Sequence, residues 1–407
     1  MELHTDRNDL TSTVVETPML VGAESAGGMT MAELRQNYET ILRARAIHYP
    51  VAYQFPRVLG KGRQGIVFLA LRQGARGCIT EHAIKVFDPQ IYRNPVAYWT
   101  DMGRIASQIS QLQRIQCPNL VPRHSYEETY GIGYVQMESI DGVDLRFILS
   151  GKHVDAVREN STSEEWARFM ETLFYIEGDR MAFRPGLVVH ILRGALRGIE
   201  RLHSANFLHC DIKPGNIMID RLGNVKVVDF GRAAVVGERS SFLPGSPMYM
   251  APEIHCREKT TIQSDFYSLG LVGLEMLRGK SLPGAVKMNE QQLLGLKMHL
   301  QDDLSELLPD YVIGNENLIS ILKRFIDPDP MKRHPSAKEA ESGNEGLKVI
   351  DKQFVQEGVD VEYSRDLSDY LAKLVDSRTS RIEVSKKNNG VDPSTETLVR
   401  QTGPITS

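Results

Sequence analysis

The residues best suited to chemistry lie in the stretch His209–Asn216 and at Asp229, which follows a short apolar run. Lys213 and Asn216 follow Asp211 by two and five residues, and Asp229 comes eighteen residues after Asp211. An aspartate can accept a proton, a lysine can contact phosphate, and an asparagine with a second aspartate can bind a divalent metal ion. This set predicts a phosphoryl-transfer centre. The alternative is two unrelated polar turns in a globular enzyme.

Together these segments resemble the catalytic loop and the metal-binding turn, here Asp229–Gly231, of the eukaryotic-type (Hanks-type) serine/threonine protein kinase family. The resemblance implies that Asp211 accepts or orients the proton of a substrate hydroxyl and that Lys213 steadies the transferred phosphoryl group. It also implies that Asn216 and Asp229 bind Mg²⁺. Cys210 departs from the family pattern, in which most members have arginine.

Composition places the chain among soluble globular proteins. Its 407 residues are 41% hydrophobic and 25% charged, enough for a large core in about two or three domains or lobes. The net charge of −4 offers no general attraction to nucleic acid or to an anionic membrane. The sequence shows no CxxC spacing, no signal-peptide pattern and no apolar run long enough to span a bilayer. We therefore expect a cytoplasmic protein that binds no nucleic acid.

A helix is predicted upstream of the chemical residues. Thr30 and Glu33 form a capping-box pattern. Apolar residues then recur at helical spacing: Leu34, Tyr38, Ile41 and Leu42. Residues 1–52 are therefore predicted to be an N-terminal extension with one helix. The neighbouring domain is the simplest cover for its apolar stripe, and a helix of a partner is the alternative.

Short β-rich runs begin near residue 53 and carry a glycine-rich turn. Gly60, Gly62 and Gly65 form the pattern GxGxxG, which also occurs where a strand leads into the helix of a dinucleotide-binding domain. Here β-branched and apolar residues follow the last glycine directly, so a strand-turn-strand is predicted. The kinase resemblance implies that these glycines, with Leu59 and Val67, bind ATP.

Lys85 lies within an apolar strand that follows this turn. A buried amine is costly without an anionic partner, and nucleotide phosphates would supply one; a solvated surface lysine is the alternative. By the resemblance, Lys85 binds the α- and β-phosphates, Met137 is the gatekeeper and Asp144 reaches the ribose. The full set of further nucleotide contacts implied in this way is Ala83, Met137, Glu138, Ile140 and Asp144.

Gln108 is the second departure from the family. Members of the family have a glutamate that pairs with the strand lysine, on the helix that we predict over about residues 100–116. An amide oxygen carries no full charge, so Gln108 is expected to hold Lys85 less firmly. The substitution Gln108→Glu is expected to raise turnover.

The segment Gly245–Glu253 resembles the substrate-positioning loop of protein kinases. Small-molecule phosphotransferases usually lack this loop, so the resemblance implies a protein substrate. Ser246 together with Lys213 matches serine/threonine rather than tyrosine kinases. Further along, the resemblance implies that Asp265 holds the catalytic-loop backbone and that Arg333 pairs with the glutamate at the end of the loop.

The predicted architecture is an α+β, two-lobed protein-kinase-like fold over residues 53–340, with an antiparallel β-rich small lobe (53–140) and a mainly helical large lobe (141–340). About 151–185 is an insertion, interpreted as a decorated surface loop or, alternatively, a docking element. Residues 341–407 are predicted to be a C-terminal extension with a disordered tail. Its short amphipathic helix contains Leu367, Leu371, Leu374 and Val375. Partners could dock through the insertion or the termini.

Two functions are open to such a chain. One is an ATP- and Mg²⁺-dependent serine/threonine protein kinase with Asp211, Lys213 and Lys85 as catalytic residues. The other is a weak or inactive pseudokinase that acts as a nucleotide-binding scaffold, which Gln108 favours. Lys85, Asp211, Asn216 and Asp229 favour the enzyme, because a chain freed from catalysis would have no need of all four.

Overall fold

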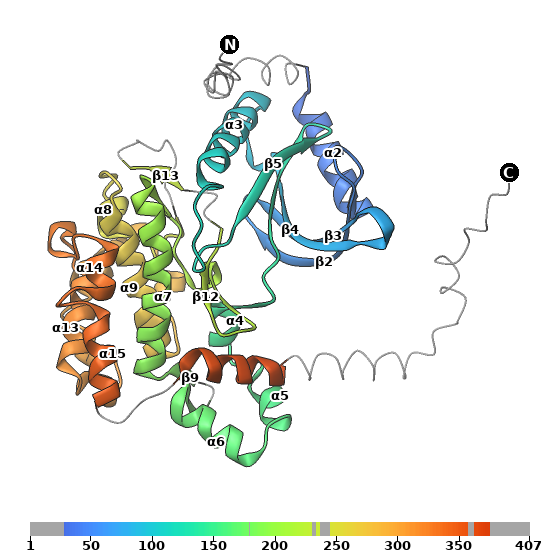
Figure 1. Ribbon diagram of the computed structural model, residues 1–407. Coiled ribbons are helices and arrows are strands. Elements are labelled where there is room, and N and C mark those ends of the chain that lie inside the picture. The colour runs from blue at the N-terminus through green and yellow to red at the C-terminus, as the bar shows by residue number, and fades with distance from the viewer. Residues whose placement is uncertain (1–27, 179, 230–232, 237–244, 357–361, 375–407) are drawn as a thin grey trace, which may run out of the picture. The chain divides into compact units, whose positions relative to one another are not determined.

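The computed structural model describes residues 28–178, 180–229, 233–236, 245–356 and 362–374. These residues form two compact units. The first contains the described part of Met1–Asp141 with Gly198–His209 and Val228–Val236; the second contains Gly142–Arg197, Cys210–Val227 and the described part of Gly237–Ser407. The predicted two-lobed α+β fold is confirmed, because the first unit is built on an antiparallel sheet and the second is mainly helical (Figure 1).

The first unit contains a six-stranded sheet in which every neighbouring pair of strands is antiparallel. The strand order is β1 (Ala46–Ile47), β2 (Tyr53–Gly62), β3 (Gly65–Gln73), β4 (Ile79–Phe87), β6 (Ile132–Glu138) and β5 (Arg123–Thr129). β3 and β4 form the predicted hairpin, since Gln73 pairs with Ile79 across a turn that contains the 3₁₀ helix Ala75–Gly77. β4 ends in five consecutive buried residues, the pattern of a strand covered on both faces.

Helix α2 (Met31–Ala44) covers part of the same unit (Figure 1). The Glu33 N–H donates to Thr30 Oγ1 at 3.3 Å and the Thr30 N–H donates to Glu33 Oε2 at 2.7 Å, so the predicted capping box is present. Leu34, Tyr38 and Ile41 are buried, and the helix contacts β1 and β6. The sheet of its own unit therefore covers the apolar stripe, as the sequence predicts.

Helix α3 (Pro95–Leu112) packs against β5 and begins earlier than predicted. Asn94 caps the helix by accepting a hydrogen bond from the Ala97 N–H at 2.8 Å, and Pro95 takes the first helical position. This capping pattern was not predicted from the sequence. The predicted helix also extends beyond Leu112, which is the last residue of α3 and its last buried residue.

The second unit is organised around helix α9 (Ile262–Arg278), most of whose residues are buried. A Cβ on Gly270 would lie 2.7 Å from the Phe325 Cβ, so glycine lets α9 and α13 (Glu316–Phe325) approach closely. The other helices are α4 (Leu145–Leu149), α5 (Val154–Glu159), α6 (Ser163–Thr172), α8 (Pro252–His255), α10 (Glu290–His299), α11 (Leu304–Leu307), α12 (Asp310–Ile313), α14 (Ala337–Ser342) and α15 (Leu347–Gln356). Helix α7 (Pro185–Ser204) begins in this unit, and its last residues, from Gly198, belong to the first. Two small antiparallel sheets, β12-β11-β7 and β8-β9, comprise β7 (Gly142–Asp144), β8 (Phe174–Glu177), β9 (Arg180–Phe183), β11 (Ile217–Asp220) and β12 (Val225–Val227).

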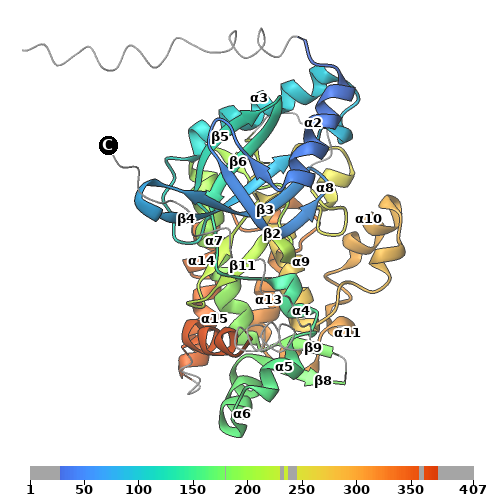
Figure 2. The same cartoon turned by 90° about the vertical axis from the view of Figure 1, so that its right-hand side faces the viewer.

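The insertion is folded, and whether it serves as a surface decoration or as a docking element stays a prediction. It contains α5, α6 and the β8-β9 hairpin, and residues 363–374 form a helix beside it (Figure 2). The Tyr370 hydroxyl is hydrogen-bonded to His153 Nδ1 at 2.9 Å, and the Tyr370 ring packs against Phe169 and Phe174. The aromatic residues of the insertion therefore share a core with the C-terminal helix.

This C-terminal helix is the one that the sequence predicts. Leu367, Leu371 and Leu374 are buried on it, whereas Val375 and the predicted tail lie outside the described residues. Helix α15 (Leu347–Gln356) precedes it and was not predicted.

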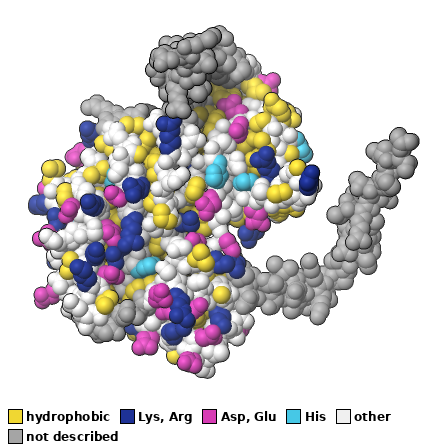
Figure 3. Space-filling view, in the orientation of Figure 1, with side chains coloured by type: hydrophobic (Ala, Val, Ile, Leu, Met, Phe, Trp, Pro, Cys, Tyr) yellow, Lys and Arg dark blue, Asp and Glu magenta, His cyan; other side chains and the backbone are white. Residues whose placement is uncertain are grey.

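The described surface carries charges of both signs. On the face shown in Figure 3, Lys and Arg side chains are interspersed with Asp and Glu side chains. This face therefore presents no extended field of a single sign, in keeping with the net charge of −4. Among the helices that the structure describes, none combines the length and the apolar character needed to cross a membrane.

Candidate active site

The glycine-rich turn joins β2 to β3 with no helix between them. Gly62 pairs with Gly65 across the turn, so the predicted strand-turn-strand is confirmed and the dinucleotide-binding alternative is wrong. Gly65 has a φ of 146°, and a Cβ there would lie 2.0 Å from the Val86 carbonyl oxygen, so only glycine fits. A Cβ at Gly60 would meet no atom within 4 Å, which leaves open space beside the turn.

Four of the predicted nucleotide contacts lie on one face of the sheet. Val67 pairs with Lys85 between β3 and β4, and Ala83 pairs with Met137 between β4 and β6. Directly paired residues, and residues two apart on one strand, project to the same face of a sheet. The structure therefore brings together an apolar surface and one amine, the combination that an adenine ring with attached phosphates requires.

The remaining predicted nucleotide contacts lie near the ends of strands. Leu59, in β2, is 41% exposed. Glu138 ends β6, and Ile140 lies in the connection that follows it. Asp144 belongs to the second unit, where its carboxylate caps helix α4. The roles of these four residues in nucleotide binding stay predictions.

Lys85 is buried in β4 and held by two oxygen atoms. Its Nζ donates to Asp229 Oδ1 at 2.6 Å and to Gln64 Oε1 at 3.1 Å. The residue is only 6% exposed, so the surface-lysine alternative is wrong. The Asp229 side chain is 39% exposed, so this carboxylate has a solvent-facing side. Phe230 and Gly231, which complete the predicted metal-binding turn, lie outside the described residues.

Gln108 does not hold Lys85, which corrects the premise drawn from the sequence. Its Nε2 donates to the Ala233 carbonyl at 2.5 Å, and the same carbonyl accepts a hydrogen bond from Arg104 Nη1 at 3.2 Å. Among the described residues, Gln108 Oε1 has no hydrogen-bond partner. An amide can donate to a carbonyl where a carboxylate cannot. Helix α3 is therefore tied to that backbone segment, and Gln64 supplies the neutral oxygen that the sequence analysis assigned to Gln108.

Arg123, at the start of β5, is a second cation near Asp229 and was missed by the sequence analysis. Burial lowers the pKa of its guanidinium to about 10, while the charge of Asp229 raises that pKa. Asp229 has a φ of 54°, a left-handed conformation that aspartate adopts more readily than most residues. A single arginine before a polar strand gives no sequence signal that distinguishes it from a surface charge.

Asp211, Lys213 and Ser246 form a three-way contact in the second unit. Lys213 Nζ donates to Asp211 Oδ2 at 2.6 Å, Ser246 Oγ donates to Asp211 Oδ1 at 2.9 Å, and Lys213 Nζ donates to Ser246 Oγ at 3.2 Å. Asn216 Nδ2 donates to the Asp211 backbone carbonyl at 2.7 Å. Asp211 is 5% exposed, so its carboxylate is desolvated and surrounded by donors. The structure thus brings Lys213 and Ser246, the two serine/threonine-type residues, to the predicted proton acceptor.

The backbone of this loop is fixed at Cys210, which has a φ of 64°. The Cys210 N–H donates to Asp265 Oδ1 at 2.9 Å, the contact that the resemblance implied. Gly245, with a φ of 101°, passes so close that a Cβ would lie 2.7 Å from the Cys210 carbonyl oxygen. These contacts fix the loop against the start of the segment that carries Ser246.

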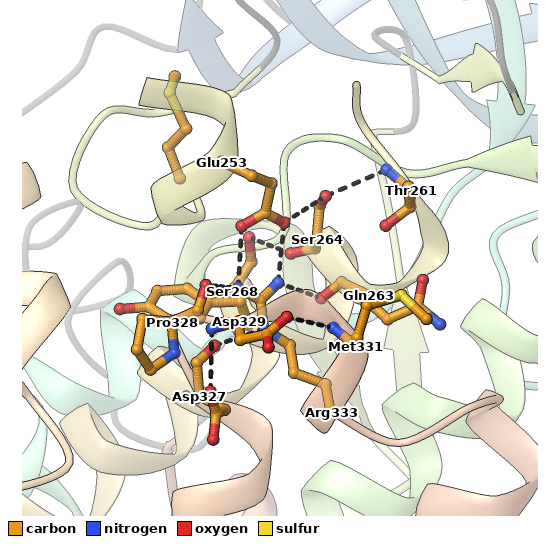
Figure 4. Close-up of polar contacts among 12 residues, drawn as sticks. Glu253, Thr261, Gln263, Ser264, Ser268, Asp327, Pro328, Asp329, Met331 and Arg333 are labelled. Atoms are coloured by element: carbon orange, nitrogen blue, oxygen red, sulfur yellow. Dashed lines mark hydrogen bonds and ion pairs between the residues drawn. The ribbon is translucent and has the colours of Figure 1, made fainter. Parts of the chain in front are cut away.

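The far end of the same segment is held by a buried ion pair (Figure 4). Arg333 Nη1 and Nη2 donate to Glu253 Oε1 and Oε2, each at 2.8 Å, and the two side chains are 0% and 3% exposed. Ser264 Oγ donates to Glu253 Oε1 at 2.7 Å, and Arg333 Nη1 donates to the Gln263 carbonyl at 2.9 Å. The predicted pair is confirmed. It lies within further hydrogen bonds, the condition under which a buried ion pair is tolerated.

Comparison with known proteins shows which family the sequence belongs to. The family model "Protein kinase domain" matches residues 53–342, a range that includes both the glycine-rich turn and the Asp211 loop. The chain belongs to the protein kinase family.

Similar kinases come from bacteria and from a plant. The "Probable serine/threonine-protein kinase pknA2" of Bifidobacterium longum (strain NCC 2705) is 26% identical over 232 residues, which cover 56% of this chain and 26% of that protein. The "Mitogen-activated protein kinase kinase 2" of Arabidopsis thaliana is 29% identical over 291 residues, covering 70% of this chain and 69% of that protein. The "Serine/threonine-protein kinase PrkC" of Bacillus subtilis (strain 168) is 24% identical over 352 residues, covering 83% and 48%.

The shared kinase domain is only part of several relatives. This chain spans about a quarter of the B. longum kinase, whose covered share is 26%, and about half of the B. subtilis kinase, whose covered share is 48%. The family therefore establishes a protein kinase fold. The activity, substrates and partners of this chain are matters for proposal.

Each unit of the kinase contains one residue whose chemistry suits the Mg²⁺ ion that the family implies. Asp229 has a carboxylate that is 39% exposed. The amide of Asn216 is oriented by the Nδ2 hydrogen bond to Asp211, which leaves Oδ1 as its ligand atom. Carboxylate and amide oxygens are hard ligands of the kind that Mg²⁺ prefers. Each of these two side chains, taken by itself, therefore has the chemistry of a Mg²⁺ ligand.

Proposed function

We propose that this chain is a protein kinase that transfers the γ-phosphoryl group of ATP to serine or threonine hydroxyls of protein substrates. The observation that carries the proposal is the contact of Asp211 with Lys213 and Ser246. A buried carboxylate with a lysine at 2.6 Å and a serine hydroxyl at 2.9 Å holds one geometry. A fixed proton acceptor beside a cation is what transfer to a hydroxyl requires.

In this reaction the substrate hydroxyl oxygen bonds to the γ-phosphorus, the bond to the ADP oxygen breaks, and the hydroxyl proton goes to Asp211. Ser246 donates to Asp211 Oδ1 and keeps the carboxylate from rotating. Lys213 neutralises the carboxylate before transfer and can follow the negative charge onto the phosphoryl oxygens. The protein contributes mainly position and electrostatic stabilisation, because little other covalent chemistry is needed.

Residues of the first unit would hold the nucleotide. Lys85 would exchange the neutral Gln64 oxygen for a phosphate oxygen, a stronger and charge-assisted hydrogen bond. The glycines of the β2-β3 turn would let the backbone approach the phosphates. Asp229 of this unit would supply one ligand to Mg²⁺, which neutralises phosphate charge when bound, and Asn216 of the second unit is proposed as the other.

A pseudokinase that binds nucleotide without transferring phosphate is the second candidate, and one observation favours it. Gln108 is bonded to the Ala233 carbonyl rather than to Lys85, so helix α3 does not itself position the strand lysine. The four retained residues Lys85, Asp211, Asn216 and Asp229 favour the enzyme.

Transfer of label from [γ-³²P]ATP to dephosphorylated casein, followed by phosphoamino-acid analysis, tests the proposal. Wild type should label serine and threonine, and Lys85→Met should not. Thermal shift by Mg·ATP separates the roles, because a ligand of the folded state raises its stability: Asp229→Ala should lose the shift and Asp211→Ala should keep it. A Mg·ATP shift in wild type without any transfer would establish the scaffold instead.

A further inference from the structure

Lys297, on helix α10, is fully buried, although nothing in its sequence context marks it. Its Nζ donates to the Pro247 carbonyl at 2.7 Å and to the Met250 carbonyl at 2.6 Å, and it lies 3.0 Å from His255 Nε2. An ammonium group has three donor hydrogens, so this one side chain can serve all three acceptors. A buried lysine is costly unless it is bonded in this way. Lys297 therefore acts as a tether, which here means that its ammonium group holds the loop carbonyls and His255 to helix α10.

The loop that Lys297 binds is the one that carries Ser246. Pro247 follows Ser246 directly, and Ser246 is hydrogen-bonded to Asp211. Helix α9 holds the same loop independently, since Ser268 Oγ donates to the Tyr249 carbonyl at 2.8 Å. Loss of Lys297 would therefore leave the loop attached through α9, but without the ammonium that donates to two of its carbonyl groups.

We propose that Lys297 is a positioning residue for the protein substrate, because it holds the loop Ser246–Met250 in the conformation that sets Ser246 beside Asp211. The inference rests on the proposed kinase activity and deepens it. Lys297 acts through the loop and does not touch the reacting atoms. Its loss should therefore raise the KM for a protein substrate and leave the KM for ATP nearly unchanged.

This tether should strengthen as the pH rises through neutrality, because release of the loop would expose the amine and return its pKa toward the ordinary value. Burial lowers the pKa of Lys297 to about 7, and the charge of Glu253 raises it. The other groups facing this site are His255 on α8, Glu290 with Oε1 at 3.4 Å from His255 Nδ1, and Tyr267, whose hydroxyl donates to the Lys297 carbonyl at 3.3 Å. Burial, followed by the Lys297 charge, lowers the pKa of His255, so a neutral ring accepts from the ammonium. Above pH 7 the neutral amine keeps two hydrogens, one for each loop carbonyl, without the cost of a buried charge.

Hydrogen–deuterium exchange on the full chain tests the tether without reference to activity. Lys297→Met keeps the length of the side chain but has no donor, and Lys287→Met, at an exposed lysine, is the matched control. We expect amide exchange over residues 246–256 to rise about fivefold in Lys297→Met alone. Lys297→Gln keeps two donor hydrogens, should give an intermediate rise, and replaces the methionine variant if that variant unfolds. Unchanged exchange in this segment overturns the tether.

Phosphorylation of dephosphorylated casein tests the positioning role. Lys297→Met should raise the KM for casein about tenfold, equivalent to about 1.4 kcal/mol, and change the KM for ATP by less than about twofold. The wild-type to Lys297→Met ratio of kcat/KM for casein should be smallest at pH 6 and rise about threefold by pH 8.5, because only wild type sheds the cost of a buried charge. Equal rises in both KM values, or a ratio independent of pH, overturn the role. No transfer by wild type refutes the proposed function, and the exchange result still decides the tether.

Discussion

Replacing Gln108 by glutamate, the residue typical of the family, should lower the stability of the folded protein. Gln108 Nε2 donates to the Ala233 carbonyl at 2.5 Å, at a site that is 5% exposed. Glutamate places an acceptor opposite that carbonyl and buries an ionised carboxylate. Leaving a buried group unpaired costs about 1–3 kcal/mol. An uncompensated buried charge costs about 3–5 kcal/mol, part of which Arg104 would offset, because its Nη1 donates to the same carbonyl at 3.2 Å. We expect Gln108→Glu to lower the free energy of unfolding by about 3 kcal/mol at pH 8.

Urea unfolding between pH 5 and pH 8 measures this loss, with Gln108→Met as the matched control. Burial should raise the pKa of the new carboxyl group above its unfolded value. Stability is then present at low pH and lost as the pH rises through the folded-state pKa, so the deficit of Gln108→Glu should shrink toward pH 5. Gln108→Met removes the same hydrogen bond without adding a charge. Its loss should be about 1–2 kcal/mol at every pH.

The result that would refute this reasoning is a Gln108→Glu variant as stable as wild type at pH 8 that also turns over faster. The new carboxylate would then have turned to Lys85 and displaced Gln64. Helix α3 would dock as the family pattern implies, and the bond to Ala233 would not determine its position.

Arg333→Met leaves the Glu253 carboxylate buried without its cation and should lower the free energy of unfolding, measured in urea, by about 3–5 kcal/mol. Adding Glu253→Gln to this variant should recover part of the loss. An equal loss in the single and the double variant would contradict the pairing. Burial lowers the pKa of His334 to about 4, below its unfolded value, so its contribution is present above pH 6.5 and lost as the pH falls toward 4, by up to about 3 kcal/mol. His334→Phe should flatten that part of the pH–stability curve, and an unchanged curve would show that His334 does not titrate this way. Truncation after Gln356 removes the buried side chains of the helix 363–374 and should lower the calorimetric Tm by about 5 °C or more; an unshifted Tm would mean that this helix adds nothing to the core.

Features set by short spacings along the chain could be predicted from the sequence. Asp211 and Lys213 are two residues apart in one loop, so the backbone of that loop brings them together. The glycine-rich turn was distinguished from its dinucleotide-binding alternative by the β-branched residues after Gly65, because those residues favour a strand over a helix. The Thr30 capping box was equally local.

Features that depend on competition for a partner could not be predicted. Gln108 can donate or accept, and only the position of the Ala233 carbonyl decides which it does. Lys297 has the sequence context of a surface lysine. It is buried because it binds a loop that lies far from it in the sequence, Pro247 being 50 residues earlier. The way the insertion packs could not be predicted, because its core is completed by Tyr370, which lies 217 residues after its hydrogen-bond partner His153.

Single-turnover transfer is the most direct test of the kinase assignment. In separate reactions, wild type and Asp211→Asn, each in excess over [γ-³²P]ATP, are mixed with dephosphorylated casein and Mg²⁺. Asparagine keeps the size of the side chain but cannot take the hydroxyl proton, so transfer should slow at least about 100-fold, while Mg·ATP raises the melting temperature of both proteins equally. Equal transfer rates in the two proteins, or no transfer by a wild type that binds Mg·ATP, would contradict the assignment of Asp211 as the proton acceptor of a protein kinase.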